Sequence, residues 1–332
     1  MPPLVPWETF RSETDAPPLL LGAMNFGKRT PEDEAHRIVH RALERGVTFV
    51  DTANAYVDGE SERIVGRALR GRRDRALVAT KVGLSKIGGQ TSGLVRIGGT
   101  PEGLSRKRIL EACDESLSRL GMDHVDLYYL HVPDARTPIE ETLSAIATLL
   151  QAGKIRAWGV SNYASWQVLE MIHWCDREGV PRPVMAQQIY NVLVRQLDVE
   201  WFAFARRYRF HTAAYNPLAG GLLARPKSAV PEPGSRFDEN PMYQRRYWTD
   251  AFHAHVADYA ALASEAGLST LALAYGFVAS RPGVDSVLVG PATALHLDDA
   301  IALCRPLPPD VLARVDELHR AHTGTDATYA RL

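Results

Sequence analysis

The sequence predicts a single (β/α)8 barrel on three observations. Short apolar or β-branched runs alternate along the chain with longer amphipathic stretches, as parallel strands joined by crossover helices require. The short runs are almost wholly apolar, which is typical of strands covered on both sides. A chain of 332 residues can hold two average domains, but barrels of this kind commonly reach that length as one domain. We therefore predict one domain over residues 1–332, with an extended N-terminal segment at 1–17 and a C-terminal helix and tail at 312–332.

Strands and helices follow this pattern in strict alternation. The strands are predicted at Leu19–Met24, Thr48–Thr52, Ala76–Val82, Val125–His131, Ala157–Ser161, Val184–Tyr190, His211–Asn216 and Ser286–Gly290. The first helix, Pro31–Arg45, shows the signals used for all of them. Thr30 can cap it, acidic residues oppose the positive end of its dipole, and Gly46 ends it. The other helices are predicted at Glu60–Leu69, Ser105–Leu120, Pro138–Ala152, Ser165–Glu178, Val199–Tyr208, Phe252–Ala266 and Thr293–Cys304.

Two segments are too long for ordinary connections between a strand and a helix. Gly83–Gly103 is rich in glycine and serine, and Leu223–Tyr247 is rich in proline and arginine. Long loops at the strand ends of a barrel commonly shape a ligand site, so we expect both segments near one. The alternative is that they are disordered insertions.

Charge and composition exclude several classes of function. The 38 basic and 39 acidic residues give a net charge of −1, so the chain has no overall field to attract nucleic acid or an anionic membrane. Neither a signal peptide nor a run of roughly 20 apolar residues is apparent, and a cytoplasmic location is expected. The three cysteines and the scattered histidines form no disulfide or metal-binding pattern, so no metal is predicted.

Ionisable residues stand at or just beyond the ends of three predicted strands. The second strand ends in Asp51, with Tyr56 five residues later in FVDTANAYVDGESE, the third in Lys81 in LVATKVG, and the fourth in His131 in DLYYLHVPD. Each residue alone would be ordinary, because an aspartate can cap a helix and a tyrosine can fill a core. Burying such groups singly is costly, however, and the C-terminal ends of barrel strands converge on one mouth. We therefore expect the four side chains to meet.

These four side chains suit the reduction of a carbonyl group. An ammonium beside a phenol favours the phenolate and lowers the phenol's pKa from about 10, which makes Tyr56 a competent general acid. Asp51 would neutralise and orient Lys81, and His131 would donate a hydrogen bond to the substrate carbonyl oxygen. We predict catalytic roles for all four residues, and we expect Tyr56 and His131 to contact the substrate.

Reduction also needs a hydride source, and later strand ends offer a site for one. Ser161 and Asn162 in GVSN, together with Gln187, can hydrogen-bond a carboxamide. The ring of Tyr215 in AAYNPLAGGLL can stack on a nicotinamide. No G-x-G-x-x-G fingerprint opens a first strand–helix unit, which disfavours a Rossmann domain.

From about Leu19 to its C-terminus the chain resembles the aldo-keto reductase superfamily. The resemblance rests on FVDTANAY, ATKVG, LYYLH, GVSN, YNPLAGG and the spacing of Gln187 four residues before Asn191. It implies an NAD(P)H-dependent barrel enzyme that binds its cofactor before its substrate. With this resemblance, the predicted cofactor site comprises Met24, Asp51, Ser161, Asn162, Gln187, Tyr215, Asn216, Leu218, Gly290, Thr293 and His296.

The stretch LVGPATALHLDDAI departs from the family pattern. Gly290 precedes a helix that begins near Thr293, and this helix N-terminus can seat a phosphate. Relatives commonly carry basic or hydroxyl-rich residues here for the 2′-phosphate of NADPH, and a Gln and an Asn later for adenine. This chain has Ala292, His296 and Ala300 instead. NADPH is the predicted cofactor, and NADH is the alternative.

Further motifs resemble the aflatoxin aldehyde and succinic semialdehyde reductase subgroup. They include VSNYASWQVLEM, YNVLVRQ, SRF at 235–237, RRYW at 245–248 and the closing TYAR. By analogy, Arg331 and Arg236 would bind a substrate carboxylate, and Tyr247 and Trp248 would anchor the loop that carries Arg236. The alternative for Arg331 is a solvated side chain at the C-terminus. The same analogy implies a polar or acidic aldehyde and a monomer or homodimer.

Reduction of an aldehyde, or of a ketone, is the predicted function. The expected partner is a small-molecule carbonyl substrate, and neither nucleic acid nor a membrane is expected. Two alternatives stay open. The same residues would catalyse the reverse oxidation of an alcohol or a sugar. A cofactor-binding regulatory subunit, like the channel-associated members of the superfamily, is an alternative of another class.

Overall fold

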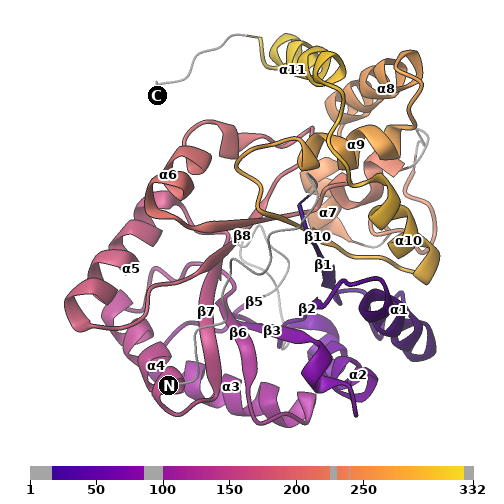
Figure 1. Cartoon of the computed structure of the whole chain (residues 1–332). Coiled ribbons are helices and arrows are strands. Elements are labelled where there is room, and N and C mark those ends of the chain that lie inside the picture. The colour runs from indigo at the N-terminus through magenta and orange to yellow at the C-terminus, as the bar shows by residue number, and fades with distance from the viewer. Residues whose placement is uncertain (1–16, 86–99, 225–229, 239, 325–332) are drawn as a thin grey trace. The chain divides into compact units, whose positions relative to one another are not determined.

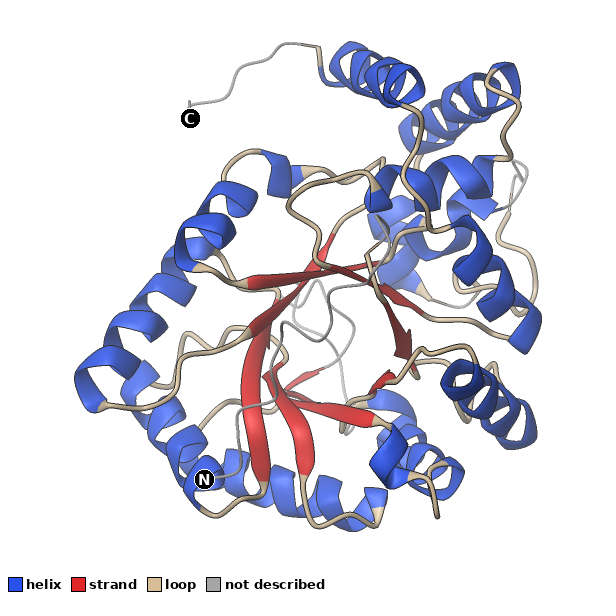
Figure 2. Cartoon of the chain, viewed as in Figure 1, coloured by secondary structure: helices blue, strands red, loops and turns tan. Residues whose placement is uncertain are grey.

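The computed structural model describes residues 17–85, 100–224, 230–238 and 240–324. Its barrel strands are β1 (Leu19–Gly22), β2 (Phe49–Asp51), β3 (Leu77–Val82), β6 (Val125–Leu130), β7 (Ile155–Ser161), β8 (Met185–Ile189), β9 (His211–Tyr215) and β10 (Ser286–Val289). These parallel strands form a closed barrel in the order β1-β10-β9-β8-β7-β6-β3-β2, and helices alternate with them along the chain (Figures 1 and 2). The predicted (β/α)8 barrel is confirmed.

Each of the eight helices predicted to alternate with the strands is present, with ends that differ from the prediction by at most two residues. The helices are α1 (Glu32–Glu44), α2 (Glu60–Ala68), α3 (Arg106–Leu120), α4 (Ile139–Gln151), α5 (Ser165–Glu178), α6 (Trp201–Tyr208), α7 (Pro241–Tyr247), α8 (Asp250–Glu265), α9 (Thr270–Ala279), α10 (Ala294–Leu303) and α11 (Pro309–Thr323). The C-terminal helix, α11, begins a few residues before the predicted start. The sequence pattern misses α7 and α9. In α9 every residue from Leu273 to Ala279 is buried, so the helix lacks the polar face that produces an amphipathic period.

The predicted cap of α1 is wrong. Pro31 is the N-cap residue, and no side chain caps the helix. Thr30 instead donates its hydroxyl to the carbonyl oxygen of Ala292 at 3.2 Å. Proline starts a helix without such a cap because its φ is already near the helical value.

Both long segments carry secondary structure in their described parts. Gly83–Gly103 contains an antiparallel pair, β4 (Leu84–Ser85) and β5 (Thr100–Pro101), in which Leu84 lies opposite Pro101. Leu223–Tyr247 contains the end of a 3-10 turn, η5 (Ala219–Ala224), and the helix α7. Residues 86–99, 225–229 and 239 lie outside the described residues.

Contacts divide the chain into two compact units, each with its own core. From Leu19 onward, the first unit holds Leu19–Gln188 and Val289–Leu297, and the second holds Ile189–Leu288 and Asp298–Leu332. The largest fully buried side chains of the first unit include Trp158, Tyr128 and Tyr129. Those of the second include Tyr190, Tyr247, Tyr259 and Phe277. The single-domain organisation stays a prediction.

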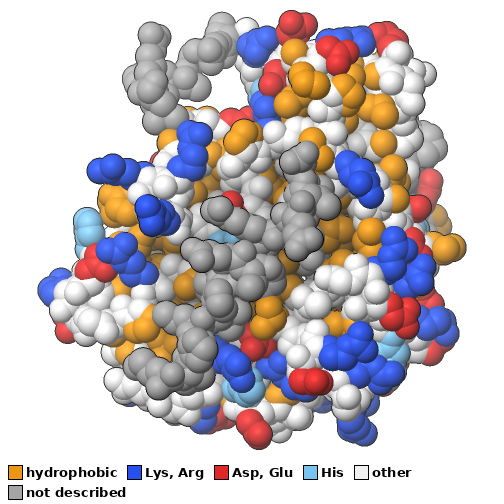
Figure 3. All heavy atoms as spheres, viewed as in Figure 1, with side chains coloured by type: hydrophobic (Ala, Val, Ile, Leu, Met, Phe, Trp, Pro, Cys, Tyr) orange, Lys and Arg blue, Asp and Glu red, His pale blue; other side chains and the backbone are white. Residues whose placement is uncertain are grey.

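The surface carries charges of both signs. On the face shown in Figure 3, blue Lys and Arg side chains lie next to red Asp and Glu side chains. In the described part of the chain, no single helix is long and apolar enough to cross a membrane. The pair α8 and α9 reaches the required length and composition, but it is bent by 93° at the break between the helices.

Candidate active site

A buried lysine–aspartate pair lies inside the first unit. The side chains of Lys81 on β3 and Asp51 at the end of β2 are 0% and 1% exposed. Lys81 donates from Nζ to Asp51 Oδ1 and, at 2.8 Å, to the carbonyl oxygen of Thr52. Gln187 on β8 donates from Nε2 to the other carboxylate oxygen, Asp51 Oδ2. Each oxygen of the buried carboxylate therefore has its own donor, as burial requires.

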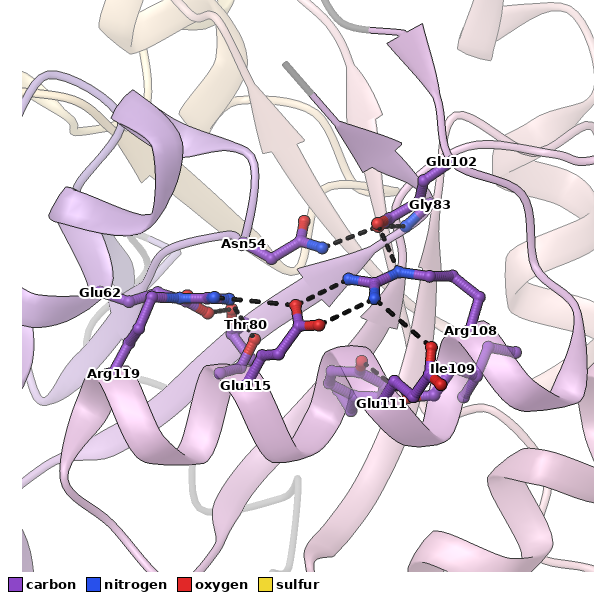
Figure 4. Close-up of polar contacts among 12 residues, drawn as sticks. Asn54, Glu62, Thr80, Gly83, Glu102, Arg108, Ile109, Glu111, Glu115 and Arg119 are labelled. Atoms are coloured by element: carbon purple, nitrogen blue, oxygen red, sulfur yellow. Dashed lines mark hydrogen bonds and ion pairs between the residues drawn. The ribbon is translucent and has the colours of Figure 1, made fainter. Parts of the chain in front are cut away.

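Burial and mutual attraction act in opposite directions on this pair. Burial raises the pKa of the Asp51 carboxyl and lowers the pKa of the Lys81 ammonium, while their Coulomb attraction and hydrogen bond oppose both shifts. Glu62 adds a second Coulomb contribution that raises the pKa of Lys81. It is fully buried on α2 and accepts hydrogen bonds from Thr80 and Arg119 (Figure 4). Two carboxylates thus favour the charged form of Lys81.

Tyr56 lies beside this ammonium, at the start of the 3-10 turn η2 (Tyr56–Gly59). Lys81 Nζ is 5.1 Å from the centroid of the Tyr56 ring. The next residues, Val57 and Asp58, have φ angles of 50° and 54°. A β-branched residue in the left-handed region costs roughly 1–3 kcal/mol, and strain of this kind clusters at functional sites. Such strain persists only where the surrounding structure imposes it, so the backbone immediately after the tyrosine is held in place.

His131 completes the group that the sequence predicts. Its imidazole lies 5.8 Å from the Tyr56 ring, centroid to centroid, with the planes at 79°. It is 6% exposed, and burial followed by the charge of Lys81 lowers the pKa of the imidazole well below its ordinary value. The ring is therefore neutral at pH 7, and a neutral imidazole donates one hydrogen bond. Its Nδ1 is buried and has no partner within the described residues.

We expect His131→Gln to change how stability depends on pH. Folding lowers the pKa of His131, so below about pH 6.5 the unfolded chain binds more protons and the native protein loses stability as the pH falls. Glutamine takes up no proton, so the variant should lose about 1.4 kcal/mol less free energy of unfolding per pH unit in this range. Urea unfolding at several pH values measures both slopes, and equal slopes would contradict the prediction. The other histidines are common to both proteins and cancel in the comparison.

Three residues predicted to bind the cofactor lie together where the end of β7 meets the middle of β8. Ser161 is the register partner of Gln187. Asn162 has a φ angle of 65°, its backbone N–H donates to the carbonyl oxygen of Gln187 at 3.2 Å, and its Nδ2 donates to Ser161 Oγ at 2.9 Å. Asn162 Nδ2 also donates to the carbonyl oxygen of His131 at 3.0 Å. The cluster therefore joins the predicted cofactor residues to the catalytic group.

The end of β1 is tied to the turn after β10. Met24, another predicted cofactor residue, is half-buried in the turn that follows β1. The next residue, Asn25, donates from Nδ2 to the carbonyl oxygen of Gly290 at 3.2 Å. Through Asn25, the predicted cofactor residues Met24 and Gly290 are thus brought close together.

At the start of α10 the predicted phosphate seat already has partners. The backbone N–H of Ala294 donates to Glu34 Oε1 at 2.7 Å, and that of His296 donates to Thr293 Oγ at 3.3 Å. Glu34, from the first turn of α1, thus places a carboxylate where the helix dipole attracts an anion. A phosphate at this helix would share its N-terminus with that carboxylate.

The second unit holds the predicted residues Tyr215, Asn216, Leu218 and Arg236. Tyr215 ends β9, and burial raises its pKa to about 12. Asn216 has a φ angle of 62° and donates from Nδ2 to the hydroxyl of Tyr247 at 3.4 Å. The fully buried Tyr247 therefore supports the chain that follows β9.

Arg236 is held against an aromatic ring in the same unit. It donates to the hydroxyl of Tyr243 at 3.3 Å, and its guanidinium lies 5.4 Å from the centre of that ring. The neighbouring Phe237 packs on Trp248 with ring centroids 4.9 Å apart, which fixes this stretch as predicted for a loop anchor. Arg331, the other predicted substrate residue, lies outside the described residues.

Comparison with known proteins identifies the family. The Aldo/keto reductase family matches residues 18–320. The chain belongs to this family. It is 37% identical over 277 residues to human aflatoxin B1 aldehyde reductase member 2, covering 80% of this chain and 70% of that protein. It is 31% identical over 306 residues to a probable voltage-gated potassium channel subunit beta of Arabidopsis thaliana, covering 89% and 90%.

A solved structure agrees with this assignment. The glycerol dehydrogenase of Gluconobacter oxydans matches with a TM-score of 0.74 and 26% identity, over 95% of this chain and 94% of that one. The resemblance predicted from the motifs, including that to the aflatoxin aldehyde reductase subgroup, is confirmed. This aldo/keto reductase is an oxidoreductase, and its family acts with nicotinamide cofactors on small carbonyl compounds.

Sequence reasoning missed three acidic residues around the site. Glu62 supports Lys81, Glu34 occupies the start of α10, and Glu102 contacts the segments that follow β2 and β3. Glu34 is acidic and lies in the first turn of α1, which predicts an interaction with the dipole of its own helix and not with α10. Glu62 and Glu102 carried none, because their partners are set by how separate elements pack.

Proposed function

We propose that this aldo/keto reductase reduces an aldehyde to an alcohol and that Tyr56 gives the proton to the carbonyl oxygen. The position of Lys81 carries the proposal: its ammonium is buried, is held by Asp51 and lies 5.1 Å from the Tyr56 ring centroid. A positive charge there stabilises the phenolate that remains when the proton leaves. Neutral His131 directs the carbonyl oxygen with a hydrogen bond. A bound reduced nicotinamide supplies the hydride for the carbonyl carbon.

The donor set suits a nicotinamide dinucleotide. Ser161, Asn162 and Gln187 offer the hydroxyl and amide groups that a carboxamide binds, and Tyr215 offers a ring for stacking. NADPH is the proposed cofactor, and we propose that the Glu34 carboxylate at the start of α10 repels its 2′-phosphate. We also propose a polar or acidic aldehyde as substrate, with Arg236 and Arg331 at its carboxylate, and a cytoplasmic monomer or homodimer.

We expect Glu34→Gln to tighten NADPH binding by about five-fold and to leave NADH binding almost unchanged, because only NADPH brings a further anion to the start of α10. Glutamine keeps an oxygen for the Ala294 N–H, so the helix start is preserved. Asp33→Asn is the matched control, since it removes the same charge from the same turn of α1. Both carboxylates pair with Arg37, but it is Glu34 that accepts from the Ala294 N–H. Fluorescence titration of the wild type and both variants with each cofactor gives the six affinities. Equal changes for NADPH and NADH would show that Glu34 does not act on the 2′-phosphate.

The function itself is tested by titrating the protein with NADPH and NADH and then following absorbance at the nicotinamide band after adding 4-nitrobenzaldehyde. Binding followed by cofactor oxidation supports the reductase. Binding without turnover across a broad aldehyde panel would instead favour a regulatory subunit, an alternative that the likeness to a potassium channel subunit beta keeps relevant. Turnover only with an alcohol and the oxidised cofactor would favour a dehydrogenase, as in the similar glycerol dehydrogenase.

A further inference from the structure

Glu102 connects three elements around the candidate active site. Its carboxylate is 9% exposed, and Oε1 accepts hydrogen bonds from Asn54 Nδ2 at 2.7 Å and from the backbone N–H of Gly83 at 2.9 Å. Its Oε2 accepts from Arg108 Nε on α3 at 2.7 Å. Figure 4 shows Asn54, Gly83 and Arg108 all directed at this one carboxylate. Asn54 lies two residues before Tyr56, and Gly83 lies two residues after Lys81.

The contacts of Glu102 add to the backbone hydrogen bonds that join the segment after β2 to β3. After β2, Thr52 N–H donates to the carbonyl oxygen of Ala79 at 2.9 Å, and Asn54 N–H donates to that of Lys81 at 3.2 Å. The Tyr56 N–H instead donates within its own segment, to the carbonyl oxygen of Ala53 at 3.1 Å. Asn54 is therefore held at the end of β3 twice, by its backbone N–H at Lys81 and by its side chain at Glu102.

Gly83 is bound to Glu102 through both of its backbone groups. Its N–H donates to the carboxylate, and its carbonyl oxygen accepts from the N–H of Glu102 at 3.3 Å. Gly83 has a φ angle of 116°, and a Cβ there would lie 3.1 Å from a methyl group of Leu104. This conformation and this spacing suit glycine alone. In this conformation the end of β3 lies within reach of the carboxylate that also binds Asn54.

Arg108 restrains the other end of the carboxylate. The guanidinium holds Glu102 Oε2, and it also donates to both oxygens of Glu115 at 2.9 and 2.8 Å. A charge-assisted hydrogen bond of this kind is directional and shorter than a neutral one. Arg108 thus binds Glu102 from α3 through Nε, while its two terminal nitrogens bind Glu115.

We propose that Glu102 is a positioning residue that holds the Asn54–Tyr56 segment against the end of β3 and so sets the place of the Tyr56 hydroxyl relative to Lys81 and His131. The proposal rests on the proposed role of Tyr56. The strained φ angles of Val57 and Asp58 indicate that the surrounding structure holds the segment after the tyrosine, and Glu102 holds the segment before it. The tyrosine is therefore held from both sides.

The test compares Glu102→Ala with Glu115→Ala. Both variants remove a carboxylate from Arg108, but only the first removes the contacts to Asn54 and Gly83. We expect Glu102→Ala to lower kcat by about 10- to 100-fold, with little change in the dissociation constants of the cofactors, and Glu115→Ala to stay near wild type. Asn54→Ala should resemble Glu102→Ala, and the double variant should lose no more than either single one. Equal losses in Glu102→Ala and Glu115→Ala, or losses that multiply in the double variant, would overturn the proposal.

A second measurement does not depend on activity. Hydrogen–deuterium exchange should speed up in peptides covering residues 53–59 of Glu102→Ala and stay unchanged in Glu115→Ala, and no difference between the two would overturn the proposal. Should the alanine variant fail to fold, Glu102→Gln keeps an oxygen for Asn54 and Gly83 and loses only the bond to Arg108. Glu102→Gln should show a smaller loss of kcat and a smaller increase in exchange over residues 53–59. Wild-type values of both would again overturn the proposal. Absence of turnover in the wild-type protein would refute the reductase function, while exchange would still decide whether Glu102 holds this segment.

Discussion

Tyr56→Phe is expected to lower kcat by roughly 100- to 10,000-fold, the range typical for loss of a general acid, and to change cofactor affinity by less than about two-fold. Phenylalanine keeps the ring, so the edge-to-face contact with His131 and the position beside Lys81 can both persist. Only the hydroxyl that would give the proton is removed. Single-turnover absorbance measurements with preformed enzyme–cofactor complex separate the chemical step from binding.

Tyr128→Phe is the matched control for this change. Tyr128 lies on β6 in the same unit, and its hydroxyl makes a long contact of 3.5 Å with the carbonyl oxygen of Ile109. The same atom is lost, but away from Lys81, so kcat should stay within about two-fold of wild type. A Tyr56→Phe protein that turns over like the control would show that another group gives the proton.

The barrel could be predicted because its signal is local. Each strand is a short apolar run, and each predicted helix has a polar face or an end signal of its own. The pattern fails where burial removes that contrast. The helix α9 is apolar on all sides. The helix α7 lies in a stretch of prolines and arginines, and the sequence signal for its start is Asn240 followed by Pro241. In the structure Asn240 caps α7 by accepting a hydrogen bond from the Tyr243 N–H.

The catalytic group could be predicted for a different reason. Asp51, Lys81 and His131 stand at or beside strand ends, and parallel strands in a barrel bring those ends together whatever the loops do. The contacts of Glu34 and Glu102 are not determined by strand ends in this way. Glu34 meets Ala294 across 260 positions of sequence, and Glu102 meets Asn54 across 48, so neither partner follows from a local pattern. Gln187 was predicted for the cofactor, yet its contact with Asp51 joins β8 to β2, two strands that are not neighbours in the barrel, so no local pattern predicts it.

Lys81→Met should affect both stability and turnover. Methionine fills much of the same volume but leaves the Asp51 carboxylate buried without its counter-charge, which typically costs about 3–5 kcal/mol of unfolding free energy. Loss of the charge that stabilises the Tyr56 phenolate should lower kcat by roughly 100-fold or more. The stability deficit should narrow as the pH falls, because burial without Lys81 raises the pKa of Asp51 further and the carboxyl then takes up a proton on folding.

The double variant Asp51→Asn/Lys81→Met separates these two effects. It removes both charges, so no uncompensated carboxylate stays buried, and asparagine can still accept the hydrogen bond from Gln187. We expect urea unfolding to show most of the lost stability restored, while kcat stays as low as in Lys81→Met because the phenolate still lacks its ammonium. A stable double variant with wild-type kcat would mean that the buried pair serves the fold alone and that Tyr56 does not depend on it. If the double variant is as unstable as Lys81→Met, the loss of unfolding free energy comes from lost packing around Lys81 and not from the unpaired charge.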